Sequence, residues 1–125
     1  MKKIIQTQNA PAPIGPYNQA VFSKGTLYIS GQIALEPATG NLVINDIETE
    51  THRVMQNLQA ILKEAGMDFT QVVKSSIFLM DMNNFAKVNA VYGSYFTSDF
   101  PARETVQVSG LPKNVNVEIA MIAVE

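Results

Sequence analysis

The apolar positions of this chain follow two periods, one typical of strands and one typical of helices. Ala20–Phe22 and Leu27–Ile29 are apolar runs that flank a short link, Ser23-Lys24-Gly25, which predicts a β-hairpin. A mostly apolar run at Val72–Met80 predicts a buried strand. Alternation at Glu104–Val108 and at Val115–Glu125 predicts two further strands, the second of them long.

Ile47–Ala65 has the helical period instead. Its apolar residues recur with the spacing i, i+4, i+7 and i+8, and polar residues lie opposite. These apolar residues are Val54, Leu58, Ile61, Leu62 and Ala65. Asn45 or Asp46 can cap the start of this helix, and Gly66 suits the left-handed position that follows its end.

A second helix is predicted after the strand at Val72–Met80, with Asn83 or Asn84 as its N-cap. Its apolar stripe consists of Phe85, Val88, Val91, Tyr92, Tyr95 and Phe96. The order strand, hairpin, helix, strand, helix, strand, strand indicates an α+β fold, in which two helices pack on one face of a mostly antiparallel sheet. The other face is then bare, and self-association is the simplest way to cover its apolar residues.

Composition and charge narrow the possible functions. At 125 residues, the chain is expected to form one domain, residues 1–125. Its net charge is −2, and only Lys2 and Lys3 among its lysines are adjacent, which argues against a nucleic-acid partner. It has no cysteine, and therefore no disulfide, thiolate nucleophile or Cys-based zinc site.

The same features bear on partners and location. Charged residues make up 16% of the chain, below the usual ~25%, which indicates that a partner subunit covers part of the surface. No segment reaches the ~20 apolar residues of a membrane span. The stretch MKKIIQTQNAPAP has an apolar run of only two residues, unlike a signal peptide. We therefore expect a soluble, cytoplasmic protein without a membrane partner.

Few residues of this chain can carry chemistry. The single histidine, His52, lies on the first predicted helix, and together with Glu48 it makes a poor metal site, so we expect no metal. A Ser-His-Asp triad would need the same histidine, and no glycine pattern forms a phosphate-binding or dinucleotide-binding loop. The candidates that remain are Arg103, one of two arginines, and Glu118.

Glu118 shares a face of the last strand with Ala120, Ile122 and Val124. A carboxylate among apolar neighbours is costly unless it is paired or hydrogen-bonded. A solvent-exposed edge position, or an ion pair with a lysine, would explain it without any catalytic role.

Arg103 shares a face of the preceding strand with Thr105 and Gln107. If this strand pairs with the one that carries Glu118, their side chains would form a polar pocket. An arginine at the start of a strand can equally be a surface residue. In a pocket, its natural role is bidentate capture of a small carboxylate, in an enzyme or in a metabolite sensor.

Several segments resemble the Rid family of reactive-intermediate deaminases, above all its RidA subgroup of imine deaminases. They are APAPIGPYNQA, LYISGQI, VVKSSIFLMDMNNFAKVNAVYGSYF and FPARETVQVSGLPKNVNVEIAMIAV. The resemblance implies a chorismate-mutase-like fold and a homotrimer whose six-stranded sheets form an inner barrel, with active sites between subunits. It also implies hydrolysis of 2-aminoacrylate and 2-aminocrotonate, or of their imine forms 2-iminopropanoate and 2-iminobutanoate, to 2-keto acids and ammonia, without a metal or organic cofactor.

By this resemblance, Arg103 matches the arginine that binds the substrate carboxylate, and Glu118 matches the acid that orients or activates the attacking water. Further residues match positions that line the cleft: Tyr17, Ser30, Gly31 and Asn89. Thr105 lines it as well, at a position where many relatives have cysteine, which excludes a thiol role here. Two other functions stay open: a non-catalytic module that senses 2-keto acids, and a ribonuclease or translation inhibitor, which the acidic balance disfavours.

Overall fold

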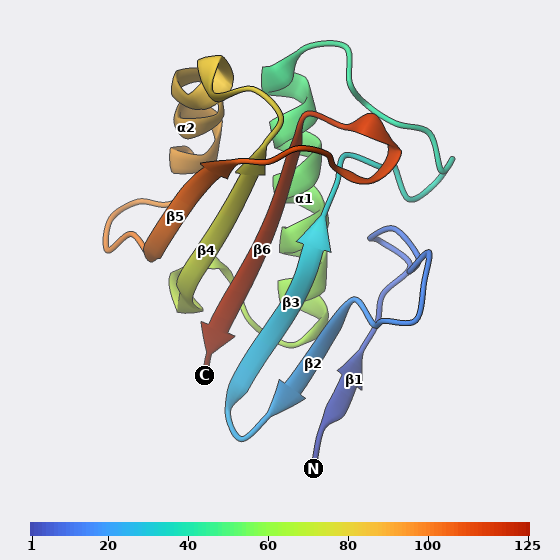
Figure 1. Ribbon diagram of the computed structural model, residues 1–125. Helices are drawn as coiled ribbons and strands as arrows, with labels where there is room; N and C mark the ends of the chain where they lie inside the picture. Colours follow the sequence, from blue (N-terminus) through green and yellow to red (C-terminus); the bar gives the residue numbers. More distant parts are fainter.

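The computed structural model describes the whole chain, residues 1–125, as six strands, two helices and three short 3₁₀ turns (Figure 1). The strands are β1 (Lys3–Ile5), β2 (Ala20–Ser23), β3 (Thr26–Gln32), β4 (Val72–Leu79), β5 (Ala102–Gln107) and β6 (Val117–Val124). The helices are α1 (Ile47–Glu64) and α2 (Phe85–Gly93), and the 3₁₀ turns are Phe69–Gln71, Met82–Asn84 and Pro112–Asn114. Each strand and helix located from the sequence pattern is present, with its ends shifted by a few residues.

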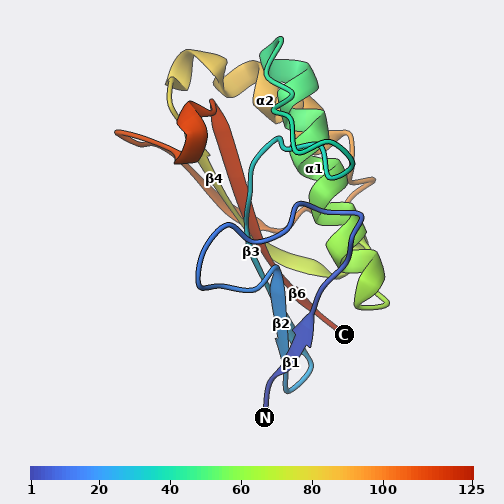
Figure 2. The same cartoon turned by 90° about the vertical axis from the view of Figure 1, so that its right-hand side faces the viewer.

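The strands form one sheet in the order β1-β2-β3-β6-β4-β5. Every neighbouring pair is antiparallel except β4 with β5. Figure 2 shows both helices on one side of this sheet. The α+β architecture expected for the single chain is therefore confirmed. No helix of the chain combines the length and the apolar character that a membrane crossing requires.

Turn chemistry explains where the hairpin and the first helix end. Between β2 and β3, Lys24 and Gly25 have φ angles of 50° and 80°, so the chain reverses through two residues rather than the three expected. Asp46 caps α1 by accepting a hydrogen bond from the Thr49 amide at 2.7 Å. Gly66 takes a left-handed φ of 74° just after the helix. Both elements are thus bounded by the residues that the sequence indicates.

The start of α2 differs from the prediction. Asn84 precedes the helix but makes no capping hydrogen bond with its side chain. Asp81 instead accepts one from the Asn83 amide at 2.9 Å and caps the 3₁₀ turn that leads into the helix. The capping therefore happens one turn earlier, where a carboxylate is available. The helix also ends before Tyr95 and Phe96, which pack on the core from the following turn.

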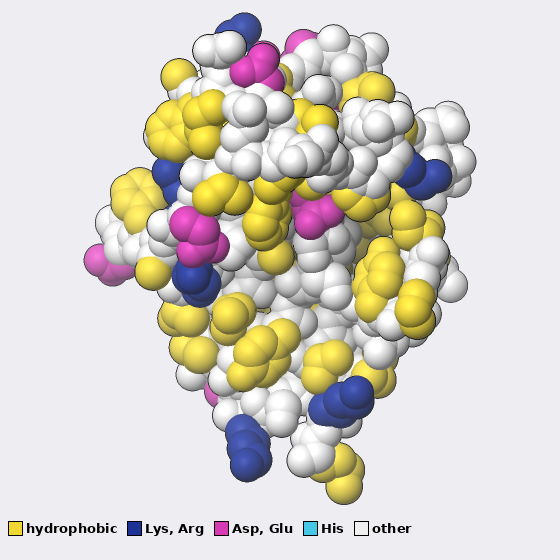
Figure 3. All heavy atoms as spheres, in the orientation of Figure 1, with side chains coloured by type: hydrophobic (Ala, Val, Ile, Leu, Met, Phe, Trp, Pro, Cys, Tyr) yellow, Lys and Arg dark blue, Asp and Glu magenta, His cyan; other side chains and the backbone are white.

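The sheet has two different faces, which β6 shows clearly. One set of its residues is buried against the helices: Val117, Ile119, Met121 and Ala123. The alternate set lies on the other face, as predicted: Glu118, Ala120, Ile122 and Val124. No helix covers this bare face, and Figure 3 shows groups of hydrophobic side chains on it. Tyr28 and Val106 are among the exposed ones, at 50% and 41%.

The pairing expected between β5 and β6 is wrong. β5 pairs in parallel with β4, Arg103 opposite Ser75 and Thr105 opposite Ile77, while β6 lies between β3 and β4. The link through α2 is a crossover connection, and such a link places the next strand parallel to the previous one. The polar pocket that a β5–β6 pair would form is therefore absent from the single chain.

Candidate active site

The Arg103 guanidinium lies between β5 and α2 and is held from several sides. Its Nη1 donates a hydrogen bond to Oδ1 of Asn89 at 2.6 Å. Its central carbon lies 5.2 Å from the ring centroid of Tyr92 and 5.7 Å from that of Phe85, within the range of cation–π attraction. No carboxylate pairs with it, because the one ion pair of the chain lies elsewhere. The side chain of Arg103 is thus held in place, and its positive charge is not neutralised within the chain, so it can bind an anion.

A hollow of about 460 Å³, here called the arginine hollow, opens beside this guanidinium. It is lined by Asn89, Tyr92, Gly93, Phe100, Pro101 and Arg103. The Tyr92 hydroxyl donates to Oγ of Ser75 at 2.9 Å. Burial raises the pKa of Tyr92, although this hydrogen bond and the charge of Arg103 oppose the rise, so the phenol is neutral at physiological pH. The arginine is therefore the only charge in the hollow, which suits a small carboxylate.

Glu118 lies in a second hollow, of about 350 Å³, on the bare face of the sheet. This glutamate hollow is lined by Ile14, Tyr17, Ser30, Gly31, Ile33, Pro112 and Glu118. Burial raises the pKa of the Glu118 carboxyl, and no hydrogen bond or charge within the chain offsets the effect. Such a carboxylate accepts a proton more readily than an exposed one, which is what a general base requires.

Within the single chain, Glu118 has neither of the two simpler arrangements expected from the sequence. It does not lie in an edge strand, because β6 is paired on both sides. It has no lysine partner, because the single ion pair in the chain joins Lys74 and Glu104. Glu118 is therefore a half-buried carboxylate with no partner inside its own chain.

The backbone of Gly31 passes directly beneath this carboxylate. A Cβ atom at position 31 would lie 2.5 Å from Oε2 of Glu118 and 2.7 Å from its Cδ, closer than real contacts of this kind. The register between β3 and β6 shifts between Ile29 and Gln32, as in a β-bulge. Glycine at this position is thus what allows the Glu118 side chain to lie over the strand.

Ser30 holds the loop beside the glutamate hollow. Its Oγ donates to the Asn18 carbonyl at 2.6 Å, and its amide donates to the Gln19 carbonyl at 2.9 Å. These bonds fix the loop that carries Tyr17, whose side chain is 45% exposed. The Tyr17 hydroxyl accepts a hydrogen bond from the Ile14 amide at 3.4 Å. The structure therefore groups Tyr17, Ser30 and Gly31 with Glu118.

Thr105 lies on the same face of β5 as Arg103 but does not line the arginine hollow. Its Oγ1 is buried and has no hydrogen-bond partner, the one buried side-chain nitrogen or oxygen of the chain without one. A buried hydroxyl without a partner costs about 1–3 kcal/mol. The hydroxyl therefore has no stabilising role within the single chain.

Two groups of candidate residues emerge, on opposite faces of the sheet. Arg103 is opposite Ser75, whose side chain is buried under the helices, whereas Glu118 is opposite Phe78 on the bare face. Asn89 joins the arginine group through its hydrogen bond. One chain cannot bring both groups to one small molecule, since the sheet lies between them.

Comparison with known proteins identifies the family to which the chain belongs. Residues 7–125 match the family described as Endoribonuclease L-PSP. A crystal structure of a conserved Rid-family protein from Yersinia pestis has a TM-score of 0.97 and 49% identity, and each chain covers 100% of the other. The chain belongs to the Rid family. The resemblance seen in its sequence motifs is therefore confirmed.

Two further relatives bear on what Rid proteins do. A 2-iminobutanoate/2-iminopropanoate deaminase from Bos taurus is 51% identical over 125 residues, which cover 100% of this chain and 91% of that protein. A crystal structure of TdcF from E. coli contains bound serine. It is 40% identical, with a TM-score of 0.94, and 98% of each chain is covered. Relatives of this Rid chain thus include a named imine deaminase and a protein that binds a small amino acid.

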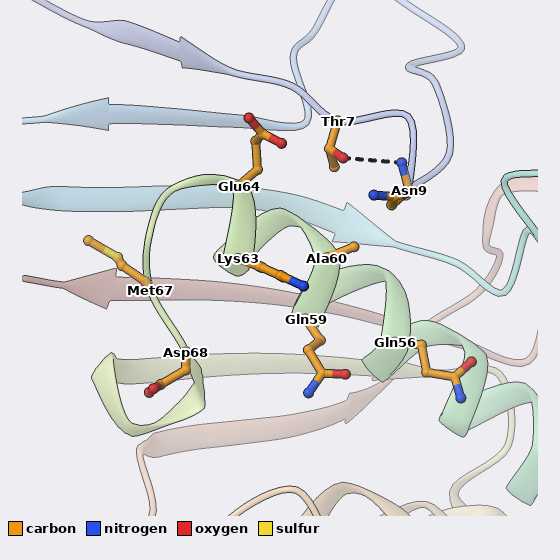
Figure 4. Close-up of a pocket in the computed structure, with 9 residues that line it drawn as sticks. All are labelled: Thr7, Asn9, Gln56, Gln59, Ala60, Lys63, Glu64, Met67 and Asp68. Atoms are coloured by element: carbon orange, nitrogen blue, oxygen red, sulfur yellow. Dashed lines mark hydrogen bonds between the residues drawn. The ribbon is translucent and has the colours of Figure 1, made fainter.

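The largest hollow of the Rid chain holds none of these candidates. It has a volume of about 720 Å³ and lies between the amino-terminal loop and the outer face of α1 (Figure 4). It is lined by Thr7, Asn9, Gln56, Gln59, Ala60, Lys63, Glu64, Met67 and Asp68. Its lining carries charges of both signs, from Lys63, Glu64 and Asp68, whereas the arginine hollow has a single unpaired positive charge. Size alone therefore does not mark the site.

Sequence reasoning missed three buried polar side chains that hold loops of the Rid chain in place. Gln19, Glu50 and Asn57 are exposed by 2%, 0% and 0%. Gln19 bonds the amide and carbonyl of Thr7, and Asn57 donates to the carbonyls of two residues near the end of β3. Glu50 and Asn57 share the apolar stripe of α1 with Val54, and a polar residue on such a stripe signals a buried hydrogen-bond network.

His52 has a packing role. Its Nδ1 lies 2.9 Å from the Tyr95 hydroxyl, and the two ring centroids are 5.7 Å apart. Burial raises the pKa of Tyr95, so its phenol is neutral at physiological pH. No group of three or more His, Cys, Asp or Glu residues is arranged to hold a metal ion.

Proposed function

We propose that this Rid protein hydrolyses imines of small 2-keto acids, 2-iminopropanoate and 2-iminobutanoate and their enamine forms, to pyruvate or 2-ketobutyrate and ammonia. The observation that carries the proposal is the unpaired Arg103 guanidinium, held by Asn89 and two aromatic rings beside an otherwise uncharged hollow. The 51% identical bovine deaminase supports the same substrate class.

The active unit is a homotrimer whose sheets form an inner barrel, with each site between two subunits. Arg103 and Glu118 lie on opposite faces of one sheet, so a complete site needs the arginine hollow of one copy beside the glutamate hollow of another. The exposed apolar side chains of the bare face, such as Tyr28 and Val106, favour such an assembly.

In this mechanism Arg103 binds the substrate carboxylate with two charge-assisted hydrogen bonds, each worth about 1.5–3 kcal/mol. These two bonds hold the imine carbon beside a water molecule. Glu118 of the neighbouring subunit orients that water and accepts its proton. Oxygen bonds to the imine carbon, and the proton passes to nitrogen. The carbon–nitrogen bond of the tetrahedral intermediate then breaks as its hydroxyl proton passes to nitrogen, which leaves the carbonyl of a keto acid and ammonia.

The other candidate residues support these two groups. Asn89 orients the guanidinium, and Thr105 offers its buried hydroxyl toward the cleft between subunits. Gly31 leaves room for the Glu118 side chain and for the ligand. Tyr17 and Ser30 form the wall of the glutamate hollow, Ser30 through the loop that it holds.

The deciding experiment compares wild type with Arg103→Ala on 2-aminoacrylate generated in situ, with keto-acid release followed over time. Loss of two hydrogen bonds, at about 3 kcal/mol or more in total, lowers kcat/KM at least about 100-fold. Arg103→Lys keeps the positive charge but cannot make the two parallel hydrogen bonds of a guanidinium, so we expect its kcat/KM to lie between those of wild type and Arg103→Ala. Arg53→Ala removes the other arginine, on α1, and serves as the matched control.

Equal rates for wild type and Arg103→Ala would refute the proposal. Binding of 2-ketobutyrate without any rate effect would identify a sensing module instead. Tight, salt-sensitive RNA binding would identify a nucleic-acid function.

A further inference from the structure

Glu50 is a buried carboxylate that the proposed mechanism does not use. It lies in α1 and is 0% exposed, and its two oxygens point at the start of β6. Oε2 accepts hydrogen bonds from the amides of Asn116 at 2.7 Å and Val117 at 3.3 Å. Oε1 accepts one from Nδ2 of Asn116 at 2.7 Å. Every hydrogen bond of this carboxylate is therefore made to the two residues that precede Glu118.

Burial of a carboxylate is costly, so an arrangement of this kind needs compensation. No cation pairs with Glu50, since the single ion pair of the chain lies elsewhere. Its three hydrogen bonds and its place in the first turn of α1, at the positive end of the helix dipole, supply that compensation. An apolar residue would fill the same space at lower cost, but it would leave the amides of Asn116 and Val117 without these acceptors.

The segment that enters β6 is one that needs such a fixed point. Lys113 and Asn114 both have left-handed φ angles, 56° and 57°, in the turn just before the strand. Residues other than glycine rarely adopt this backbone conformation, and it persists only where the surrounding structure holds the chain in place. Glu50 meets the backbone two residues later, where the register of β6 begins.

We propose that Glu50 is a positioning residue for Glu118. Its carboxylate fixes the backbone at Asn116 and Val117, and so fixes the point and direction from which the Glu118 side chain extends over Gly31. The proposal rests on the proposed function through the role given to Glu118 as the group that handles the attacking water.

The test compares Glu50→Ala with Glu50→Gln in the full-length protein. Glu50→Ala removes all three hydrogen bonds, and a shift of Glu118 by a fraction of an ångström to 1 Å lowers kcat by about 10- to 100-fold. KM stays within about threefold, because Arg103 still binds the carboxylate. Glu50→Gln keeps an acceptor for the two amides, and its new NH₂ group is satisfied when the Asn116 amide turns its oxygen inward. We therefore expect Glu50→Gln to retain most of the activity.

A second readout separates positioning from general destabilisation. Looser packing around Glu118 admits water and lowers its raised pKa, so the acid limb of the kcat–pH profile of Glu50→Ala moves to lower pH. Leu62→Ala, at the other end of α1 and fully buried, is the control. It destabilises the fold to a similar degree, and its kcat and acid limb stay those of wild type at temperatures where it is folded.

If Glu50→Ala keeps the kcat and the acid limb of wild type while Glu118→Gln is inactive, the inference is wrong and the proposed function stands. If wild type does not hydrolyse the imine, the proposed function is wrong, and if Glu118→Gln is as active as wild type, only the role given to Glu118 is wrong. An NMR titration of the Glu118 carboxyl then decides the inference, since an unchanged titration in Glu50→Ala would overturn it. Should Glu50→Ala not fold, Asn116→Ala removes one of the three bonds and must change kcat and the acid limb in the same direction.

Discussion

Replacement of Gly31 by alanine tests the geometry around Glu118 with a single methyl group. The new Cβ would lie 2.5 Å from Oε2 of Glu118, against 3.4 Å for ordinary van der Waals contact, so the oxygen must retreat by about 0.9 Å. The φ of Gly31 lies outside the left-handed region, so backbone strain does not contribute. The perturbation is therefore steric and falls on one side chain.

The expected effect follows from that displacement. A misplacement of about 1 Å at a reacting group costs up to about 100-fold in rate, so kcat of Gly31→Ala should fall by one to two orders of magnitude. The clash falls on the end of a side chain that can move into the glutamate hollow, so its cost in the free energy of unfolding should lie at the low end for overpacking, about 1 kcal/mol. Keto-acid release and urea unfolding measure the two effects, and Gly110→Ala is the control, because no atom lies within 4 Å of its added Cβ.

A double-mutant cycle isolates the cause. In a Glu118→Ala background the methyl group at position 31 meets no carboxylate, so the stability cost of Gly31→Ala should largely disappear. An equal cost in both backgrounds would refute the close approach of Glu118 to the β3 backbone. This outcome is independent of whether the protein is an enzyme.

Two further predictions concern single polar groups. Because burial raises the pKa of Glu118, the stability linked to this group is greatest below the pKa of an unfolded glutamate and is lost as pH rises through the folded pKa. In urea unfolding, Glu118→Gln should therefore have the same free energy of unfolding as wild type near pH 3 and a higher one near pH 8. It should also lose most of its kcat. A lower free energy of unfolding than wild type at both pH values would contradict this. Thr105→Val removes a buried hydroxyl without a partner, so the free energy of unfolding should stay equal or rise by about 1 kcal/mol. A clear loss of stability would mean that the hydroxyl has a partner in the assembled protein.

The local pattern of the sequence predicts the elements well, because each depends on neighbours a few residues apart. The period of α1, its Asp46 cap and the alternation of β6 all appear in the structure. The face on which Glu118 lies was predictable for the same reason, since alternation within one strand determines it.

The order of the strands was not predictable in this way. Whether β5 pairs with β6 or with β4 depends on contacts far apart in the sequence, and the position of Arg103 relative to Glu118 follows from that choice alone. Gly31 within a strand hints at a bulge, but the approach of Glu118 to it also depends on the pairing of β3 with β6, which local pattern does not give. Glu50 could have been found, because it interrupts the apolar stripe of α1.

The central place of β6 has a consequence for how the protein is made. β6 is the last strand to be synthesised, yet it pairs with β3 on one side and β4 on the other. Until residue 124 has left the ribosome, those two strands have no partner along these edges, and unpaired edges invite contact with other chains. The sheet must therefore close after translation of its last strand, through pairings between distant parts of the chain, a topology that folds slowly for its size. Nascent chains that stall before β6 should depend on chaperones more than chains that include it do.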